Sequence, residues 1–113
     1  MSETGDAALC PRFHHAVEVV GRRWSGAIIM TLVQTGSSRF NELLAAIPGI
    51  SDRLLTERLR ELEAEGIVVR TVEAARPVRV SYALSEAGKA LEPAIMALGR
   101  WAERWVTLEP EAV

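Results

Sequence analysis

Apolar residues between positions 39 and 66 recur with the period of two short helices joined by a tight turn. The first helix has one apolar face, made of four residues at the spacing i, i+3, i+4 and i+7: Phe40, Leu43, Leu44 and Ile47. Pro48 and Gly49 interrupt this pattern, and Ser51 stands where a helix N-cap is expected. Gly66 permits the left-handed closure of a Schellman motif. Two short helices arranged in this way predict a helix-turn-helix over residues 39–66.

The second of these helices has an apolar side and a polar side. At 100° per residue, Leu55, Leu59 and Leu62 share one side. The polar side offers four candidates for contacts with DNA bases: Arg53, Thr56, Glu57 and Arg60. These residue types match guanine, phosphate and cytosine groups in a major groove. An ordinary solvated helix face has a similar composition, and the face taken alone favours that simpler interpretation.

Residues 67–84 show the period of two that predicts a β-hairpin. The partner strands are Ile67–Glu73 and the alternating apolar run from Val78 to Leu84, with residues 74–77 as the connection. A hairpin directly after a helix-turn-helix is the wing of a winged helix. Four residues are candidates for contacts with phosphates or the minor groove: Arg39, Ser51, Arg76 and Arg79. The alternative is a plain hairpin whose arginines only keep it soluble.

Further helices are predicted on both sides of this unit. Residues 24–35 are apolar nearly all round, which predicts a buried central helix with Trp24 in the core. Residues 85–106 predict one long helix, bent near its start by Pro93. Its apolar stripe is the predicted dimer interface: Leu91, Ile95, Leu98, Trp101 and Trp105. We expect the stripe to pack on a second subunit, with the first helix alongside, although it can instead fold back on its own wing. Such a homodimer needs a pseudo-palindromic operator.

The ordered set of motifs resembles the HxlR-type winged-helix transcriptional regulators, relatives of the MarR group. The resemblance runs from Cys10-Pro11 to about Trp105 and rests on these segments: Val20–Trp24, Arg39–Leu43, Gly49–Arg70 and Pro77–Gly88. It implies a mainly α fold with a small hairpin wing, a homodimer formed by the N- and C-terminal helices, and DNA binding without a cofactor. Arg22 stands where a second glycine is common in the family, and we expect it to add a phosphate contact. Ser81 stands where an acid often precedes the tyrosine.

Cys10 is the single cysteine of the chain. Any disulfide must therefore join two subunits or include a small thiol. Its place at the start of the first helix favours the thiolate form. The resemblance implies that a cysteine at this position can sense oxidants or electrophiles. An inert cysteine packed beneath the dimer helices is the alternative, and a small aromatic ligand held between helices is the other candidate signal.

Length and charge fit a small regulator. The 113 residues form one domain, in which residues 1–9 are expected to be a flexible tail. The net charge of −2 is unusual for a nucleic-acid-binding protein, so we expect few phosphate contacts and a gentle salt dependence. No apolar run approaches the ~20 residues of a membrane span, and no leader is evident, which predicts a cytoplasmic protein.

No motif in the chain predicts catalysis. A glycine-rich phosphate loop, a zinc-protease motif and a nucleophile–base pair are all missing from the sequence, and His14 and His15 lack metal-ligand spacing. Glu61, Glu63 and Glu65 are expected to pair with nearby arginines. The favoured function is a homodimeric, sequence-specific repressor of transcription. The alternative is a winged-helix module that binds proteins and not DNA.

Overall fold

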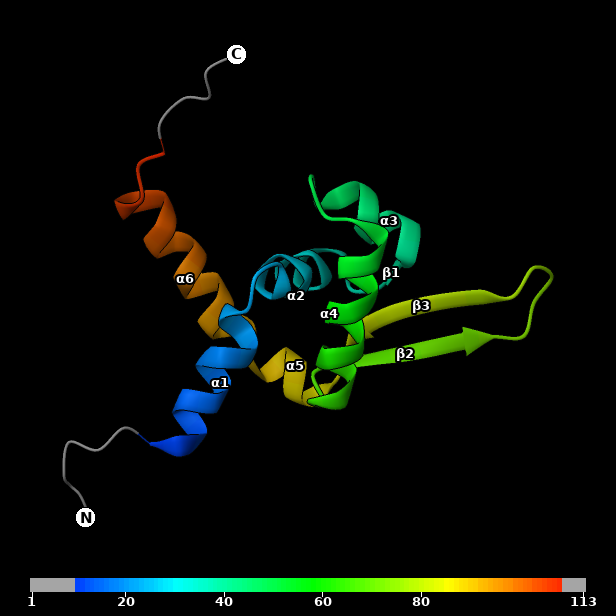
Figure 1. Ribbon diagram of the computed structural model, residues 1–113, viewed down its shortest axis with the longest axis horizontal. Coiled ribbons are helices and arrows are strands. Elements are labelled where there is room, and N and C mark those ends of the chain that lie inside the picture. The colour runs from blue at the N-terminus through cyan, green and yellow to red at the C-terminus, as the bar shows by residue number, and fades with distance from the viewer. Residues whose placement is uncertain (1–9, 109–113) are drawn as a thin grey trace.

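The computed structural model describes residues 10–108 as a mainly helical fold with a projecting hairpin (Figure 1). The predicted tail, residues 1–9, lies outside the described residues. In chain order the elements are α1 (Pro11–Gly21), α2 (Ser25–Thr35), β1 (Ser38–Arg39), α3 (Phe40–Ala46), α4 (Asp52–Ala64), β2 (Val68–Glu73), β3 (Arg79–Leu84), α5 (Glu86–Ala90) and α6 (Glu92–Trp105). The predicted helix-turn-helix and the predicted wing are both confirmed. None of the helices in this part of the chain is long and apolar enough to span a bilayer.

The core lies where α2, α3 and α4 meet. Its most buried apolar side chains are at most 1% exposed: Ile28, Ile29, Leu32, Leu43, Leu55, Leu59 and Leu62. The prediction that α2 is central is therefore confirmed, as is the inward side of α4. Trp24 precedes α2 with a left-handed φ of 78° and packs, half-buried, against this core. Burial of these side chains fixes which side of α4 faces solvent.

Both ends of α4 are closed by the predicted caps. The Ser51 hydroxyl accepts a hydrogen bond from the Leu54 N–H at 3.1 Å. At the other end, Gly66 has φ +78° and its N–H donates to the Glu63 carbonyl at 2.9 Å. The Ile67 N–H donates to the Leu62 carbonyl, also at 2.9 Å, which completes a Schellman motif. The chain therefore leaves α4 in a fixed direction and enters β2.

The sheet has three antiparallel strands in the order β1-β3-β2, one more than the sequence predicted. Ser38 pairs with Tyr82 and Arg39 with Ser81, so β1 adds to the open edge of β3. Two residues are too few to show a period of two, which is why the pattern did not reveal this strand. Val78, assigned to the second strand from its alternation, lies outside β3 and is 61% exposed.

The single long helix predicted for residues 85–106 is wrong, because the structure has two helices, α5 and α6. They separate at Leu91, two residues before Pro93. The ring of a proline clashes with the carbonyl four residues earlier and the residue lacks an N–H, so the chain cannot continue through this position as one regular helix. The Ser85 hydroxyl caps α5 by accepting from the Gly88 N–H at 3.0 Å. In Figure 1, α5 lies beside the lower end of α4, and α6 continues in a different direction.

Candidate nucleic-acid interface

The solvent side of α4 presents the four residues that the sequence singled out for base contacts. The Arg53 side chain is 87% exposed, more than any other side chain of α4 that forms an ion pair. Its Nε lies 3.2 Å from Glu57 Oε2. Thr56 Oγ1 donates to the Asp52 carbonyl at 2.8 Å, which leaves its oxygen lone pairs free. Arg60 is exposed one turn further along. A single helix face thus offers cations, an acceptor and a carboxylate to a groove of DNA.

Other charged residues of α4 are used to hold the fold together. Arg58 is only 14% exposed; its Nε donates to the Arg23 carbonyl at 2.9 Å, and its Nη1 lies 3.3 Å from the Glu61 carboxylate. The Arg23 guanidinium stacks over the Trp24 ring, 5.0 Å from the ring centre. These interactions fix α4 against the turn between α1 and α2.

The four residues predicted to contact the backbone or minor groove are all exposed. Arg39 lies in β1, beside β3, so the third strand places it at the base of the hairpin. Ser51 stands at the start of α4, where its oxygen serves the cap. Arg76 lies in the connection at the hairpin tip, and Arg79 opens β3 opposite Glu73. The hairpin and α4 therefore display separate sets of cations.

One cation of this surface, Arg70, was not recognised as functional from the sequence. It lies in β2 opposite Tyr82 and lines an open groove of 350 Å³ between α4 and the hairpin. Thr56, Arg60 and Glu63 line the α4 wall of the same groove. Because side chains alternate along a strand, Val68, Arg70 and Val72 lie on the same side of β2. Only the packing of α4 shows that this side faces α4.

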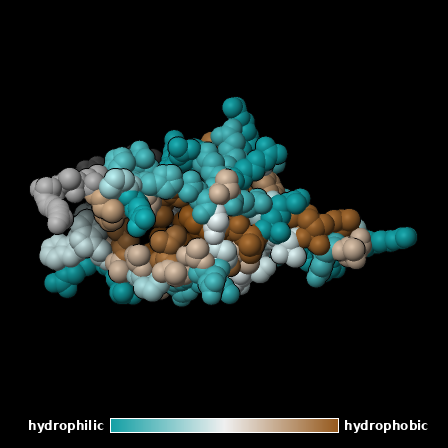
Figure 2. All heavy atoms as spheres, turned by 90° about the horizontal axis from the view of Figure 1, so that it is seen from below, coloured by the Kyte–Doolittle hydropathy of each residue, from teal (hydrophilic) through white to brown (hydrophobic). Residues whose placement is uncertain are grey.

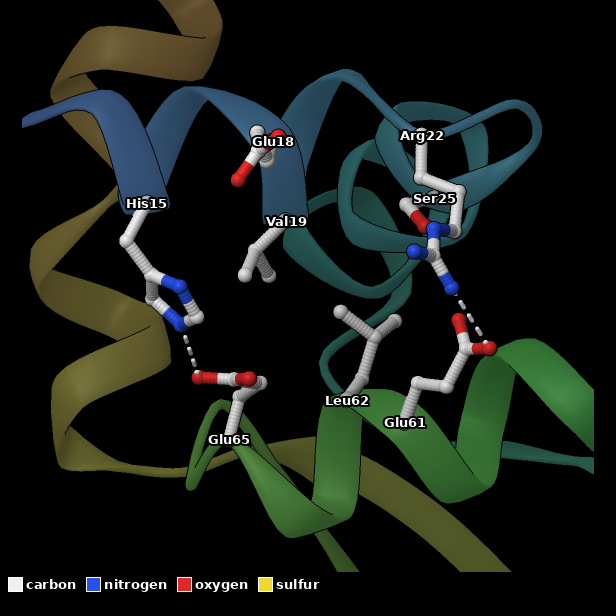
Figure 3. A pocket seen from close by; sticks show the side chains of 8 residues that line it. All are labelled: His15, Glu18, Val19, Arg22, Ser25, Glu61, Leu62 and Glu65. Atoms are coloured by element: carbon white, nitrogen blue, oxygen red, sulfur yellow. Dashed lines mark hydrogen bonds and ion pairs between the residues drawn. The ribbon is translucent and has the colours of Figure 1, made fainter.

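A second polar cluster joins α1 to the back of α4 (Figure 3). His15 Nε2 lies 2.9 Å from Glu65 Oε1, and Arg22 Nη1 lies 2.9 Å from Glu61 Oε2. We call these two pairs the α1–α4 clasp. They border a hollow of 180 Å³ into which Val19 and Leu62 point from opposite walls. Arg22 is thus paired with a carboxylate in the free protein, and its expected phosphate contact stays a prediction. Of the predicted glutamate pairs, Glu61 does bind arginines, whereas Glu65 binds a histidine.

The clasp makes the stability of the fold depend on pH. Hydrogen bonding to Glu65, followed by the attraction of its charge, raises the pKa of His15 above its ordinary value. Because protonated His15 is favoured in the folded state, its contribution is complete below the unfolded pKa of about 6.5 and is lost as pH rises through the folded pKa. We expect the unfolding free energy of the wild type, relative to that of His15→Gln, to fall as pH rises above about 6.5. His14→Gln is the matched control, and parallel curves for wild type and His15→Gln would contradict the expectation.

The predicted dimer stripe divides into buried and exposed parts. Ile95 is buried in the chain's own core and Leu91 packs against that core, so the assignment of Ile95 to a dimer surface is wrong. Ile95 faces inward because α6 starts in a new direction after Leu91. Five apolar residues of α1 and α6 remain 50–62% exposed: Phe13, Val17, Leu98, Trp101 and Trp105. We call these the α1/α6 apolar face. Both helices lie at the end opposite the hairpin (Figure 1), and Figure 2 shows apolar residues at the surface between that end and the hairpin base.

Cys10 is exposed at the N-cap of α1. Its carbonyl accepts the first helical hydrogen bond, from the His14 N–H at 2.9 Å. The thiol therefore stands at the start of the helix that carries Phe13 and Val17 of the α1/α6 apolar face and His15 of the clasp.

Comparison with known proteins agrees with this geometry. A family model described as HxlR-like helix-turn-helix matches residues 19–110. The HTH-type transcriptional regulator YvaP of Bacillus subtilis is 46% identical over 98 residues, which cover 87% of this chain and 90% of YvaP. Diamide-treated YodB from B. subtilis is 41% identical with a TM-score of 0.74, over 90% of this chain and 98% of that structure.

Redox regulators are among the similar structures. HypR, a redox regulator solved in its oxidised form, is 38% identical with a TM-score of 0.81, over 88% of this chain and 100% of that structure. YodB has also been solved with quinone bound. These proteins share the winged-helix fold of this chain. The chain belongs to the HxlR-like helix-turn-helix family, and it is a DNA-binding transcriptional regulator and not an enzyme.

Proposed function

We propose that this regulator is a cytoplasmic, homodimeric repressor that binds a pseudo-palindromic operator and is released by an oxidant, an electrophile or a small ligand. In this proposal Arg53, Thr56, Glu57 and Arg60 contact bases, and Arg39, Ser51, Arg76 and Arg79 contact phosphates or the minor groove. The observation that supports it best is the separation of the two exposed cationic surfaces, one on α4 and one on the hairpin, from the α1/α6 apolar face at the other end of the molecule.

The α1/α6 apolar face supports the dimer. Two tryptophans more than half exposed on one helix are unusual for a monomer, and aromatic side chains contribute strongly to protein interfaces. The radius of gyration is 16.5 Å, whereas a compact domain of this length has roughly 13 Å. A chain this extended leaves apolar surface that a second copy can bury. A two-fold axis through this end would leave both α4 faces free for two half-sites.

Trp101→Ala is expected to convert the dimer into a monomer at micromolar concentration. A central interface tryptophan typically contributes about 2 kcal/mol or more, and a two-fold interface loses it twice. Sedimentation velocity should therefore show a mass near the 12.4 kDa of one chain and not twice that value. Val72→Ala, which truncates an apolar residue of similar exposure on the hairpin, is the control and should stay dimeric. A Trp101→Ala protein that remains fully dimeric would exclude this helix from the interface.

Cys10 and the clasp support a signal that enters through α1. Cys10 is the N-cap residue of α1, and the clasp joins α1 and its C-cap Arg22 to Glu61 of α4 and to Glu65, the C-cap of α4. The relative YodB has been solved after diamide treatment and HypR in an oxidised form, which makes thiol oxidation the first signal to test. The quinone-bound structure of YodB makes an electrophile the second.

The function is tested with labelled duplex DNA from the region upstream of the protein's own gene, using fluorescence anisotropy. We expect tight binding that weakens at least ten-fold after diamide, which takes two hydrogens from two thiols and leaves one disulfide. Because Cys10 is the single cysteine, that disulfide joins two subunits. Cys10→Ser should bind equally well before and after treatment. If oxidation did not change binding by the wild type, the small ligand would remain as the signal. If the protein bound no duplex even at low salt, the proposed repressor function would be excluded.

A further inference from the structure

The groove between α4 and the hairpin has the composition of an anion site. Arg60 lines it from α4, and Arg70 and Tyr82 line it from paired positions of β2 and β3. Guanidinium groups and a phenol hydroxyl are donors that suit phosphate oxygens. The groove volume of 350 Å³ leaves room for a phosphodiester and part of its sugar. Glu63 is the one carboxylate on its walls.

Among residues 10–108, neither of the two groove arginines is neutralised by a direct ion pair. Within the described residues, Arg22, Arg53 and Arg58 each lie within 4.0 Å of a glutamate, whereas Arg60 and Arg70 form no such ion pair. Both side chains are exposed. Two guanidinium groups on facing walls, against the single carboxylate of Glu63, give this groove a net positive charge that favours an anion.

The position of the groove indicates which anion. It separates the α4 face, assigned to the major groove, from the hairpin, assigned to phosphates or the minor groove. Adjacent major and minor grooves of DNA are divided by one sugar–phosphate strand. When α4 and the hairpin are both bound to DNA, that strand must cross the mouth of the protein groove between them. We propose that Arg70 binds a backbone phosphate of this strand, with Tyr82 as a second donor and Arg60 adding positive charge from α4. This assignment rests on the proposed use of α4 and the hairpin.

Such a contact positions the protein without selecting a sequence. Arg70→Ala should weaken binding to the upstream duplex and to a scrambled duplex of equal length by the same factor. The slope of log affinity against log salt should become shallower by about 0.9 for each lost phosphate contact, hence by nearly two for a dimer. Arg70→Lys should keep most of the slope because it keeps the charge. Arg100→Ala on α6 removes an exposed arginine at the other end of the molecule and should leave the slope unchanged.

Phosphate ethylation interference identifies the contact directly. With wild type, we expect ethylation of one phosphate per half-site, between the major- and minor-groove contacts, to block binding. With Arg70→Ala that single interference should disappear, while the others remain. An unchanged salt slope and interference pattern for Arg70→Ala would overturn the phosphate site and leave the regulator intact. A loss confined to the upstream duplex would instead make Arg70 a base contact. If wild type binds neither duplex, the proposed DNA-binding surfaces fall and this site with them.

Discussion

Arg53→Ala is expected to abolish most sequence-specific binding while leaving weak, non-specific binding in place. Arg53 stands in the first turn of α4, where a recognition helix enters the major groove most deeply. Loss of a bidentate arginine–guanine contact typically costs about 1–3 kcal/mol, and a dimer loses two of them, so affinity should fall by at least about 30-fold. The affinity for scrambled DNA should fall far less, because fewer phosphate contacts are removed.

The pairing of Arg53 with Glu57 sharpens this experiment. In the free protein the two side chains lie 3.2 Å apart on the surface, where an ion pair contributes little to stability. Arg53→Ala should therefore unfold at nearly the same denaturant concentration as wild type. Arg53→Lys keeps the charge but not the bidentate geometry, and it should recover non-specific binding more than specific binding. Equal losses on the specific and scrambled duplexes would show that Arg53 contacts phosphate and not a base.

Gly88→Ala is expected to be among the most destabilising single substitutions in the chain. A Cβ at this position would collide with the Ile67 carbonyl oxygen and would lie 3.1 Å from Leu84 Cβ. That carbonyl accepts the Ser85 N–H at 2.9 Å, so it cannot move without breaking the bond that ties the N-cap residue of α5 to the start of the hairpin. Overpacking of this kind typically costs about 1–3 kcal/mol or more, a large share of the 5–15 kcal/mol that holds a domain folded.

Denaturant unfolding at a fixed protein concentration measures this effect, since a dimer's stability depends on concentration. Gly21→Ala is the matched control: it adds the same methyl group at the end of α1, where nothing lies within 4 Å. We expect Gly21→Ala to be neutral or slightly stabilising, because alanine restricts the unfolded chain more than glycine does. If Gly88→Ala and Gly21→Ala unfolded at the same denaturant concentration, α5 would be able to shift away from β3 at little cost.

Two features of the site, Arg70 and the clasp, could not be predicted from the sequence, because they depend on contacts between elements that are distant in the chain. The α4 face could be predicted, because a helix has a fixed period and Leu55, Leu59 and Leu62 identify its inner side. Arg70 could not, because a strand has two sides and only the packed position of α4 shows which one borders the groove. The clasp was likewise hidden, since His15 and Glu65 are separated by 50 residues.

By itself, the sequence determined the helix-turn-helix, the hairpin and the caps of α4, because each depends on residues within a few positions of one another. It also indicated the family through the order of those motifs. Only the tertiary structure decided that β1 joins the sheet, that Ile95 is buried while Trp101 is exposed, and that Arg22 pairs with Glu61. The physical reason is that local spacing fixes which residues share a face of one element, whereas packing between elements fixes what each face meets.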